Sequence, residues 1–429
     1  MKDIYIYDEF SPEDTAMMQA LYSRSAKSVT EHVEKVKSSG SGKFMETFYV
    51  GYGHASIADC GSTTIFIENI SMLADKAIQD WQLYSGQETS TRYIDMGSRE
   101  IVDPLDNQES KNIIKKWMDF YNNNQEEVQN HLKNKYPKKE DEDEIIYNKA
   151  IKARCFDITR GFLPAGITTQ LSWHTNLRQA YDKLCWLKHN PLAEVKEIAE
   201  IISTKLKEKY KNSFCQPIIE EQENYREKIM AKHNFLKPQN ISEIKMKTNI
   251  KNEDLKKFSD LLENRPLKTG LPSFLSELGT ISFEFILDFG SFRDIQRHRN
   301  GICRMPLLST SIGFNNWYLE QLPEQVRIEA EKLISEQTQA INNLNCSNEI
   351  KQYYIAMGFN VFCRNTYSLP ATAYVVELRS GKLVHPTLRK VAHEMYQVLN
   401  KKLPALKLNC DLEPDQWDYR RGLQDIIKK

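Results

Sequence analysis

The stretch from Ser85 to Tyr93 reads Ser-Gly-Gln-Glu-Thr-Ser-Thr-Arg-Tyr and brings much polar chemistry into nine residues. It carries four aliphatic hydroxyls, one carboxylate, one guanidinium and one phenol, directly after the largely apolar segment 65–83. An arginine fork beside hydroxyl and backbone donors is a common arrangement for binding phosphate. The stretch is therefore a candidate anion-binding loop at the edge of a core. The alternative is a solvated Ser/Thr-rich turn that caps the next helix.

A second group of candidate residues lies about 200 residues downstream, in the run Arg297-His298-Arg299. Two positive charges around an imidazole suit contact with an anionic cofactor or substrate. In isolation such a run is more typical of a basic surface turn. Its place directly after an apolar segment favours the functional interpretation.

Composition excludes several function classes. The 429 residues carry 58 basic and 58 acidic side chains, so net charge provides no argument for a nucleic-acid or membrane partner. No apolar run approaches the roughly 20 residues that span a bilayer. The eight cysteines show no CxxC spacing, which argues against a structural metal site and for reduced thiols. With an N-terminus unlike a signal peptide, we expect a cytoplasmic protein without a metal centre.

The elements that position these residues can be read from capping and alternation. Ser11 followed by Pro12 predicts a helix through about residue 22, and segment 70–83 has helical spacing. The β-branched run 63–67 and the alternating segment 281–286 each predict a strand. The charged region 104–150 predicts an exposed helical hairpin. Segment 217–268, rich in Lys, Glu and Asn, predicts an inter-domain linker with at most one helix.

The order of these features occurs twice. Each half has a β-rich run, an apolar segment, an abrupt polar cluster, a charged helical region and then a helix containing Leu and Arg. Placing Arg297-His298-Arg299 over Asp80-Trp81-Gln82 brings Thr280 onto Thr63. A period of about 200 residues indicates a duplicated domain rather than a solenoid, whose periods are about 20–50 residues.

The first block resembles the flavin-dependent thymidylate synthases, whose signature reads R-H-R-x-x-S-x-N-E-x-S-x-R-Y. Segment 80–93 matches this signature after its first three positions, with Gln87 in place of Asn. Segment 53–57 is similar to the family's G-H-x-S-V stretch, and segment 160–164 to its R-x-x-L-P element. Asn176-Leu-Arg178 is similar to its N-A-R element. Asp59-Cys60 and Asp182 replace the family's Glu-His and Asn.

The second block resembles the same family more weakly. It keeps Arg297-His298-Arg299 but lacks the Ser/Glu/Ser/Arg/Tyr half, and Asp294 replaces a glutamine three residues before the run. Glu377-Leu378-Arg379 is similar to the Leu-Arg that closes the N-A-R helix, where the first block has Leu187. The blocks are therefore complementary. The resemblance implies an α+β fold with two tandem thymidylate synthase-like domains, at residues 1–216 and 269–429, joined by a charged linker at 217–268.

The resemblance also implies one composite site. Its catalytic residues would be Ser90, Arg92 and Arg379. The substrate-binding residues would be Gln87, Glu88, Ser90, Arg92, Arg160 and Arg379, with the arginines on the phosphate and uracil carbonyls. The flavin contacts would be Arg297, His298, Arg299, Asn176, Arg178, His54, Ser56 and Ser62; for the last three, plain capping is the alternative.

The activity implied is C5 methylation of deoxyuridine monophosphate. FAD would be the cofactor, with methylenetetrahydrofolate and NADPH as co-substrates. We expect a homodimer, because two duplicated chains would reproduce the family's tetramer. Two alternatives stay open: a related flavin-dependent C5 modification of another pyrimidine nucleotide, and a non-catalytic nucleotide- or flavin-binding protein.

Overall fold

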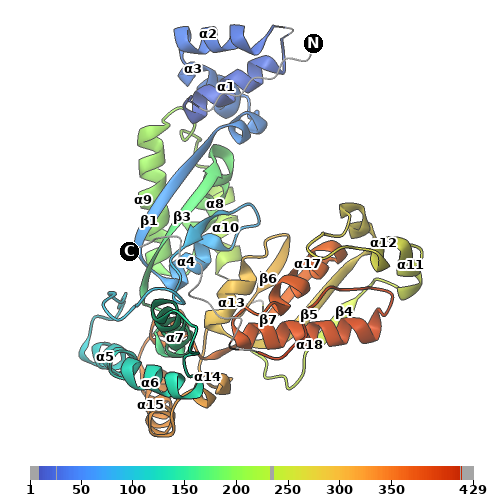
Figure 1. Cartoon of the computed structure of the whole chain (residues 1–429). Helices are drawn as coiled ribbons and strands as arrows, with labels where there is room; N and C mark the ends of the chain where they lie inside the picture. The colour runs from blue at the N-terminus through green and yellow to red at the C-terminus, as the bar shows by residue number, and fades with distance from the viewer. Residues whose placement is uncertain (1–8, 26, 232–235, 416, 418–429) are drawn as a thin grey trace. The chain divides into compact units, whose positions relative to one another are not determined.

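The computed structural model describes residues 9–25, 27–231, 236–415 and 417 (Figure 1). The chain divides into two compact units, and each is assembled from separate stretches of sequence. Unit 1 comprises Met1–Ile70, Ala77–Glu88 and Gln170–His233. Unit 2 comprises Ser71–Lys76, Thr89–Thr169 and Asn234–Lys429. The fold is α+β, with one small antiparallel sheet of order β1-β3-β2 and another of order β4-β5-β7-β6.

Unit 1 begins with helices that precede its strands. They are α1 (Pro12–Tyr22), α2 (Val29–Ser39), α3 (Gly42–Phe44), the π-helix η1 (Met45–Gly51) and the 3₁₀ helix η2 (Ala55–Cys60). The predicted start of α1 is confirmed, because the Ser11 side chain accepts a hydrogen bond from the backbone N–H of Asp14.

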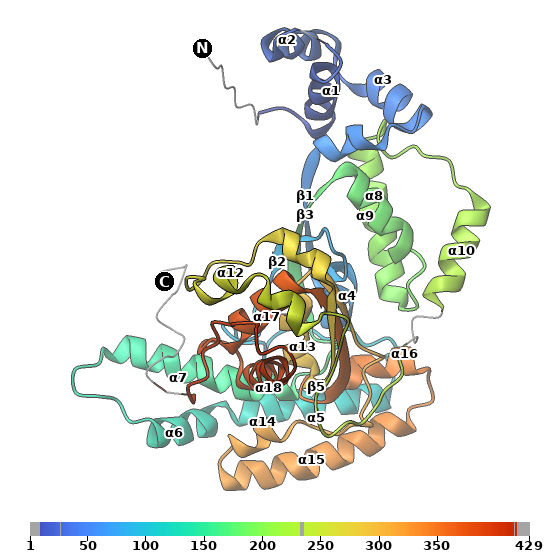
Figure 2. The same ribbon diagram turned by 90° about the vertical axis from the view of Figure 1, so that its right-hand side faces the viewer.

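The three-stranded sheet contains β1 (Ser62–Ser71), β2 (Ser85–Glu88) and β3 (Thr168–Asn176). Helix α4 (Met72–Gln79) follows β1, as its helical spacing predicts. Helices α8 (Leu177–Leu187), α9 (Ala193–Lys209) and α10 (Glu220–Met230) follow β3, and α8 and α9 lie side by side (Figure 2). The first half of the anion-loop candidate, Ser85 to Glu88, is thus an edge strand.

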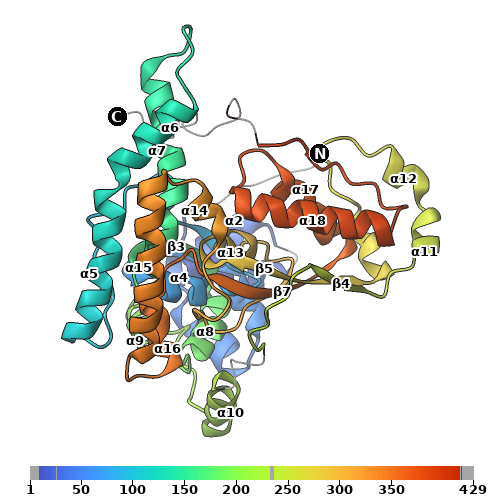
Figure 3. The same cartoon turned by 90° about the horizontal axis from the view of Figure 1, so that it is seen from below.

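The charged region 104–150 forms α5 (Gln108–Asn123), α6 (Gln125–Lys135) and the start of α7 (Glu144–Thr159) in unit 2. The prediction of helices is confirmed, but the prediction that the hairpin is exposed is wrong for α5. Trp117 and Tyr121 are buried, and the Trp117 Nε1–H donates to the backbone oxygen of Tyr354 at 3.0 Å. The charged residues on one face of α5 dominate its composition, so the composition did not indicate the apolar stripe on its other face. Figure 3 shows α15 (Glu324–Asn343) beside α5.

The four-stranded sheet contains β4 (Lys245–Thr248), β5 (Thr280–Asp288), β6 (Gly301–Arg304) and β7 (Asn360–Ser368). Helices α17 (Leu369–Ser380) and α18 (Pro386–Lys402) pack on it (Figure 3). The shorter elements of the unit are α11 (Asn252–Lys256), α12 (Ser259–Glu263), α13 (Phe289–Gln296), α14 (Asn316–Glu320) and α16 (Asn348–Lys351). Segment 217–268 contains α10, β4, α11 and α12, more structure than a linker requires.

Two series of elements follow the same order along the chain. One runs η2, β1, α4, β2 and, after a helical insertion, η3 (Arg160–Phe162), β3, α8 and α9. The other runs η4 (Ser273–Leu278), β5, α13, β6 and, after the helices α14, α15 and α16, η5 (Gln352–Tyr354), β7, α17 and α18. Their strand orders, β1-β3-β2 and β5-β7-β6, also correspond.

Segments 160–167 and 352–359 of unit 2 pair reciprocally through their backbones. The Ala165 N–H donates to Ile355 O at 2.9 Å, and the Met357 N–H to Leu163 O at 2.8 Å. Outside these lie a second matched pair of bonds, Gly166 N–H to Tyr353 O at 2.8 Å and Gly358 N–H to Gly161 O at 2.7 Å. Each bond has its counterpart when the two segments are exchanged, so the pairing has local two-fold character. This pairing holds Arg160 at the start of one segment beside the second block.

Candidate functional site

A largely buried ion pair between Arg92 and Asp157 forms one side of the candidate site in unit 2. Arg92, in the turn after β2, points its guanidinium at Asp157 near the end of α7. The Nε donates to Oδ1 at 2.6 Å and the Nη2 to Oδ2 at 3.2 Å, which is a bidentate geometry. Both side chains are largely buried, with 13% and 4% of their surface exposed. Burial, followed by the neighbouring Arg160, lowers the pKa of Arg92, although a guanidinium still stays charged at neutral pH.

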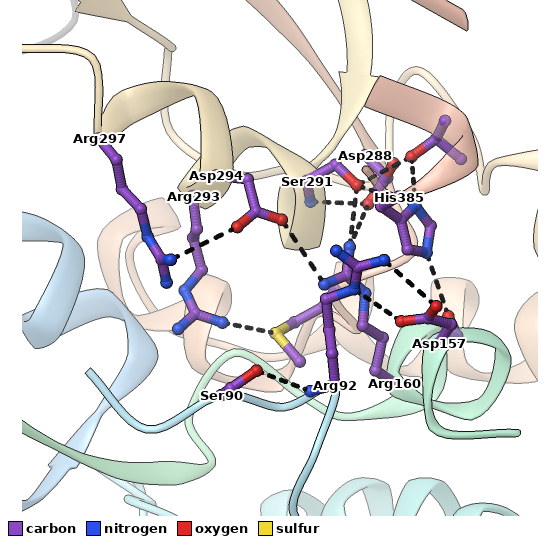
Figure 4. A network of polar contacts seen from close by, with 12 residues as sticks. Ser90, Arg92, Asp157, Arg160, Asp288, Ser291, Arg293, Asp294, Arg297 and His385 are labelled. Carbon is purple, nitrogen blue, oxygen red and sulfur yellow. Dashed lines mark hydrogen bonds and ion pairs between the residues drawn. The ribbon is translucent and has the colours of Figure 1, made fainter. Parts of the chain in front are cut away.

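Arg160 is the most deeply buried arginine of the cluster, at 2% exposure. Its Nη2 donates to the Ser291 hydroxyl at 2.9 Å, and it lies 4.0 Å from Asp288 and 3.9 Å from Asp294 (Figure 4). Its Nε–H finds no hydrogen-bond partner among the described residues. Burial opposes the charge of Arg160, but its neighbours, which include the two carboxylates, leave its pKa raised overall.

Asp288 and Ser291 are placed by the start of α13. Asp288 is the N-cap, and its Oδ2 accepts from the Ser291 backbone N–H at 2.8 Å. The same oxygen accepts from the Tyr318 hydroxyl at 2.8 Å. Burial and then the Asp288 carboxylate raise the pKa of Tyr318, so this phenol stays protonated. A local capping motif thus fixes a carboxylate next to Arg160.

Asp294 is a carboxylate that lies among the guanidinium groups of the cluster. Burial alone would raise its pKa, but Arg297, Arg160, Arg92 and Arg379 together lower it, so the carboxylate is ionised. Arg297 approaches it at 3.8 Å across one turn of helix. Those four guanidinium groups face three carboxylates, Asp157, Asp288 and Asp294, which leaves one positive charge in excess in this set. Such an excess in a partly buried setting favours an anionic ligand.

His298 orients Arg379 at the end of α17. The Arg379 Nε donates to His298 Nε2 at 2.7 Å, and its Nη2 donates to the backbone oxygen of Asp294. The imidazole is 8% exposed and meets the ring of Tyr374 edge-on at 5.9 Å. Burial and then the charge of Arg379 lower the pKa of His298 to about 3. His298 is therefore neutral, with Nε2 engaged as an acceptor.

His385 precedes α18 and is completely buried. Its Nδ1 lies 2.8 Å from the Thr387 hydroxyl and 3.2 Å from that of Ser291, and its Nε2 lies 3.2 Å from the backbone oxygen of Asp157. Burial, followed by Arg160, holds the pKa of His385 well below its ordinary value. The side chain connects the Asp157 end of the cluster to Ser291 at the start of α13.

The remaining predicted residues of unit 2 lie at the rim of this cluster. The Ser90 hydroxyl accepts from the Arg92 backbone N–H at 3.3 Å. The Arg297 side chain is 40% exposed. Arg299 is partly exposed, and its Nη1 donates to the backbone oxygen of Arg297 at 3.3 Å. Unit 2 therefore brings together Ser90, Arg92, Arg160, Arg379 and the Arg297–Arg299 run.

The other predicted residues belong to unit 1. Gln87 is exposed, and Glu88 accepts a hydrogen bond from Gln79 Nε2. Asn176 caps α8, where its Oδ1 accepts from the Gln179 N–H at 2.8 Å.

Arg178 pairs with two carboxylates, Asp59 at 2.8 Å and Asp182 at 3.4 Å. His54, Ser56 and Ser62 are exposed in the same unit, and His54 stacks on Phe48 at 6.4 Å. The acidic residues that depart from the family pattern thus neutralise the cation predicted to contact the flavin.

Sequence reasoning missed Asp157, Asp288 and Ser291. The latter two carry a visible signal, since an aspartate followed three residues later by serine at the end of an apolar strand is an N-cap pattern. Asp157 lies three residues before Arg160, but nothing in the sequence links it to Arg92. The structure joins them across 65 positions.

Comparison with known proteins identifies the first block. Residues 7–210 match the family model described as thymidylate synthase complementing protein. The motifs that carried the resemblance, Gly53 to Arg178, all lie within the matched range, so the resemblance is confirmed there. None of the helices in the described part of the chain is long and apolar enough to cross a bilayer.

The similarity to three relatives extends beyond that range. A UPF0159 protein of Chlamydia muridarum is 27% identical, covering 83% of this chain and 78% of the relative. The UPF0159 protein Ta1429 of Thermoplasma acidophilum is 23% identical, with 92% and 94% covered. A UPF0159 protein of Chlamydia pneumoniae is 23% identical, with 85% and 79% covered. The similarity to these proteins therefore includes the second block.

Proposed function

We propose that this protein is a flavin-dependent enzyme that methylates deoxyuridine monophosphate at C5, with methylenetetrahydrofolate and NADPH as co-substrates. The observation that carries the proposal is the arginine cluster of unit 2. Arg92 and Arg160 come from the first block, whereas Asp294 and Arg379 come from the second, and all four share one electrostatic network. Two blocks that each lack half of the family's motif thus contribute to one site.

The roles of the arginines follow from their exposure. Arg92 is held at the edge of the cluster by Asp157, where its remaining N–H groups and the Ser90 hydroxyl suit a phosphate. Arg379 is fixed by His298 and by the Asp294 backbone, which suits a donor aimed at a uracil carbonyl. Attack at C6 of uracil places negative charge on that carbonyl, and a preorganised guanidinium stabilises it. Arg160 is buried, so we assign it a positioning role.

The residues predicted to contact the flavin differ in how well they suit that role. Arg297 and Arg299 carry guanidinium groups at or near the surface and suit a diphosphate. His298 uses Nε2 to accept from Arg379, so it serves as a support for that arginine. When bound, the flavin supplies the redox chemistry of methylene transfer and reduction. Binding and charge placement are the protein's part.

We also propose that the two blocks descend from one duplicated domain, with 1–216 and 269–429 as the repeats. The matching order of elements, the corresponding strand orders and the reciprocal backbone bonds between segments 160–167 and 352–359 support this origin. Such a chain would form a homodimer with four repeats. Sedimentation velocity measures this state directly, and a monomer at all concentrations contradicts it.

The test of function is product analysis with all three substrates and added FAD. We expect thymidylate to form, and the purified protein to show the visible flavin absorption band. Arg92→Ala and Arg299→Ala should each abolish turnover. Trp81→Phe and Met305→Leu, at the positions where each block lacks the motif, should leave it intact. Equal loss from both pairs contradicts a composite site, and a protein that takes up no flavin contradicts the enzyme.

A second candidate is a non-catalytic nucleotide-binding protein. The observation in its favour is that Arg92 and Arg160 already have carboxylate partners, and that Arg178 of unit 1 is paired twice. Calorimetric binding of deoxyuridine monophosphate without flavin uptake or product supports this function. A product other than thymidylate supports flavin-dependent modification of another pyrimidine nucleotide.

A further inference from the structure

A small pocket of unit 2 opens beside Arg92 and is lined by positive side chains from three elements. Arg154 comes from α7, Lys382 from the loop between α17 and α18, and Arg92 from the turn after β2. Asp157 and Pro386 complete this part of the lining. Neither Arg154 nor Lys382 has a role in the site described above. Their charges lie next to Arg92, the arginine to which the proposed function assigns the phosphate.

Two carboxylates that follow α18 pair with these cations, and one of them, Asp415, also lines the pocket. Glu413 reaches Lys382 at 2.5 Å and Asp415 reaches Arg154 at 2.9 Å. The cations are 15% and 13% exposed, whereas the carboxylates are 62% and 44% exposed. The cations thus belong to the wall of the pocket, and the carboxylates approach it from the solvent side. This is the geometry expected of an acidic segment seated on an anion site.

Hydrogen bonds to Asp411 and Glu413 hold the start of the acidic segment, which comprises residues 411–415. The Asp411 backbone accepts from His393 at 2.8 Å and donates to the Ser380 hydroxyl at 2.9 Å, while Arg389 bonds the backbone oxygen of Glu413 at 2.6 Å. Beyond Glu413, the contacts include the Asp415 ion pair and a ring stack made by Trp417. The stack joins Trp417 to Tyr136 with centroids 4.4 Å apart and planes 6° from parallel. Pro414 separates the anchored part from the rest.

The remaining space is too small for a phosphate. With the segment seated, the pocket has a volume of about 30 Å³. That is room for about two water molecules, since one needs roughly 10–15 Å³ by this measure. A phosphate monoester carries close to two negative charges at neutral pH, the same charge as Glu413 and Asp415 together. Its entry would therefore exchange two carboxylates for an equivalent anion.

We propose that Arg154, Lys382 and Arg92 form a phosphate-binding subsite, and that Glu413 and Asp415 occupy it until a phosphate-bearing ligand displaces them. The inference rests on the proposed function for the identity of that ligand, a nucleoside monophosphate. To the proposed function it adds two residues that bind the phosphate, Arg154 and Lys382, and an acidic segment of the same chain that competes with the phosphate. The acidic segment lowers affinity for phosphate and excludes weak anions from the site.

The test titrates inorganic phosphate into the full-length protein by calorimetry. Glu413→Gln with Asp415→Asn removes the competing charge, and we expect roughly 2- to 20-fold tighter binding, since each exposed ion pair contributes modestly. The matched control is Asp119→Asn with Glu331→Gln, which makes the same charge change at other exposed ion pairs, 50% and 56% exposed. A chain ending at Leu412 removes the carboxylates independently.

Adding Arg154→Gln to the first double variant should abolish the gain. In the parent protein, phosphate should also change tryptophan fluorescence, and Trp417→Phe should remove that change. Unaltered phosphate affinity in both the double variant and the shortened chain overturns the proposal. A gain that survives Arg154→Gln, or that appears equally in the control, overturns it as well.

These outcomes are separate from those for the proposed function. Phosphate binding that depends on Arg154 and competes with the acidic segment supports the subsite even if no thymidylate forms. Turnover of deoxyuridine monophosphate with no effect of the double variant leaves the proposed function in place and refutes the subsite.

Discussion

Replacing Arg160 by methionine tests whether this arginine is a support for the site. The side chain is 2% exposed and touches two carboxylates, of which Asp288 is fully buried and Asp294 is 15% exposed. Methionine fills a similar volume but leaves Asp288 and the Ser291 hydroxyl without their guanidinium partner, whereas Asp294 keeps Arg297 at 3.8 Å. Removing one partner of a buried ion pair costs about 3–5 kcal/mol of folding free energy.

The expected change in melting temperature follows from that cost. Taking about 4 kcal/mol, and roughly 2–4 °C per kcal/mol for a large domain, unfolding should occur about 8–16 °C lower. Thermal unfolding monitored by circular dichroism measures the shift, and Arg160→Lys is the matched control. Lysine keeps the charge but loses the planar fork, so it should lose less stability.

The folding free energy lost in Arg160→Met should depend on pH in a defined direction. The pKa of Asp294 is lowered in the folded protein, so its ionisation stabilises the fold above the unfolded value of about 3.9 and loses this effect as pH falls through the folded value. Arg160→Met removes part of that stabilisation. The difference from the parent should therefore be full at neutral pH and shrink below about pH 4. A loss under about 1 kcal/mol, or one that grows on acidification, refutes the reasoning.

Two further predictions concern the protonation of the site and the paired segments. The pKa of His298 falls from 6.5 to about 3 on folding, so stability is lost as pH drops through that window, by up to about 1.4 kcal/mol per pH unit. His298→Gln keeps an acceptor for Arg379 without titrating, so its denaturant midpoint should be less acid-sensitive there; identical pH profiles contradict this. Gly358→Ala would place a Cβ 2.3 Å from the Phe314 ring and 2.8 Å from the backbone oxygen of Gly161, so it should cost about 1–3 kcal/mol in urea unfolding. Gly270→Ala, with nothing within 4 Å, is the control, and equal effects at both glycines would show that the close approach has no consequence.

The sequence alone determined the elements whose signals are local. The start of α1 follows from Ser11 and Pro12, strand β1 from a β-branched run and strand β5 from alternation, because capping, side-chain type and period are properties of neighbouring residues. The α+β class and the match of residues 7–210 to the family model were also predictable, because the motif residues keep their spacing.

The partners of the arginines were decided only by the tertiary structure. Arg92 meets Asp157 and Arg160 meets Ser291 across 65 and 131 positions, and no local pattern specifies such pairs. The burial of Arg160 could not be predicted from the sequence either, because most arginines in proteins are exposed to solvent. Residues from both blocks can share unit 2 because the backbone pairing of segments 160–167 and 352–359 joins stretches about 190 positions apart.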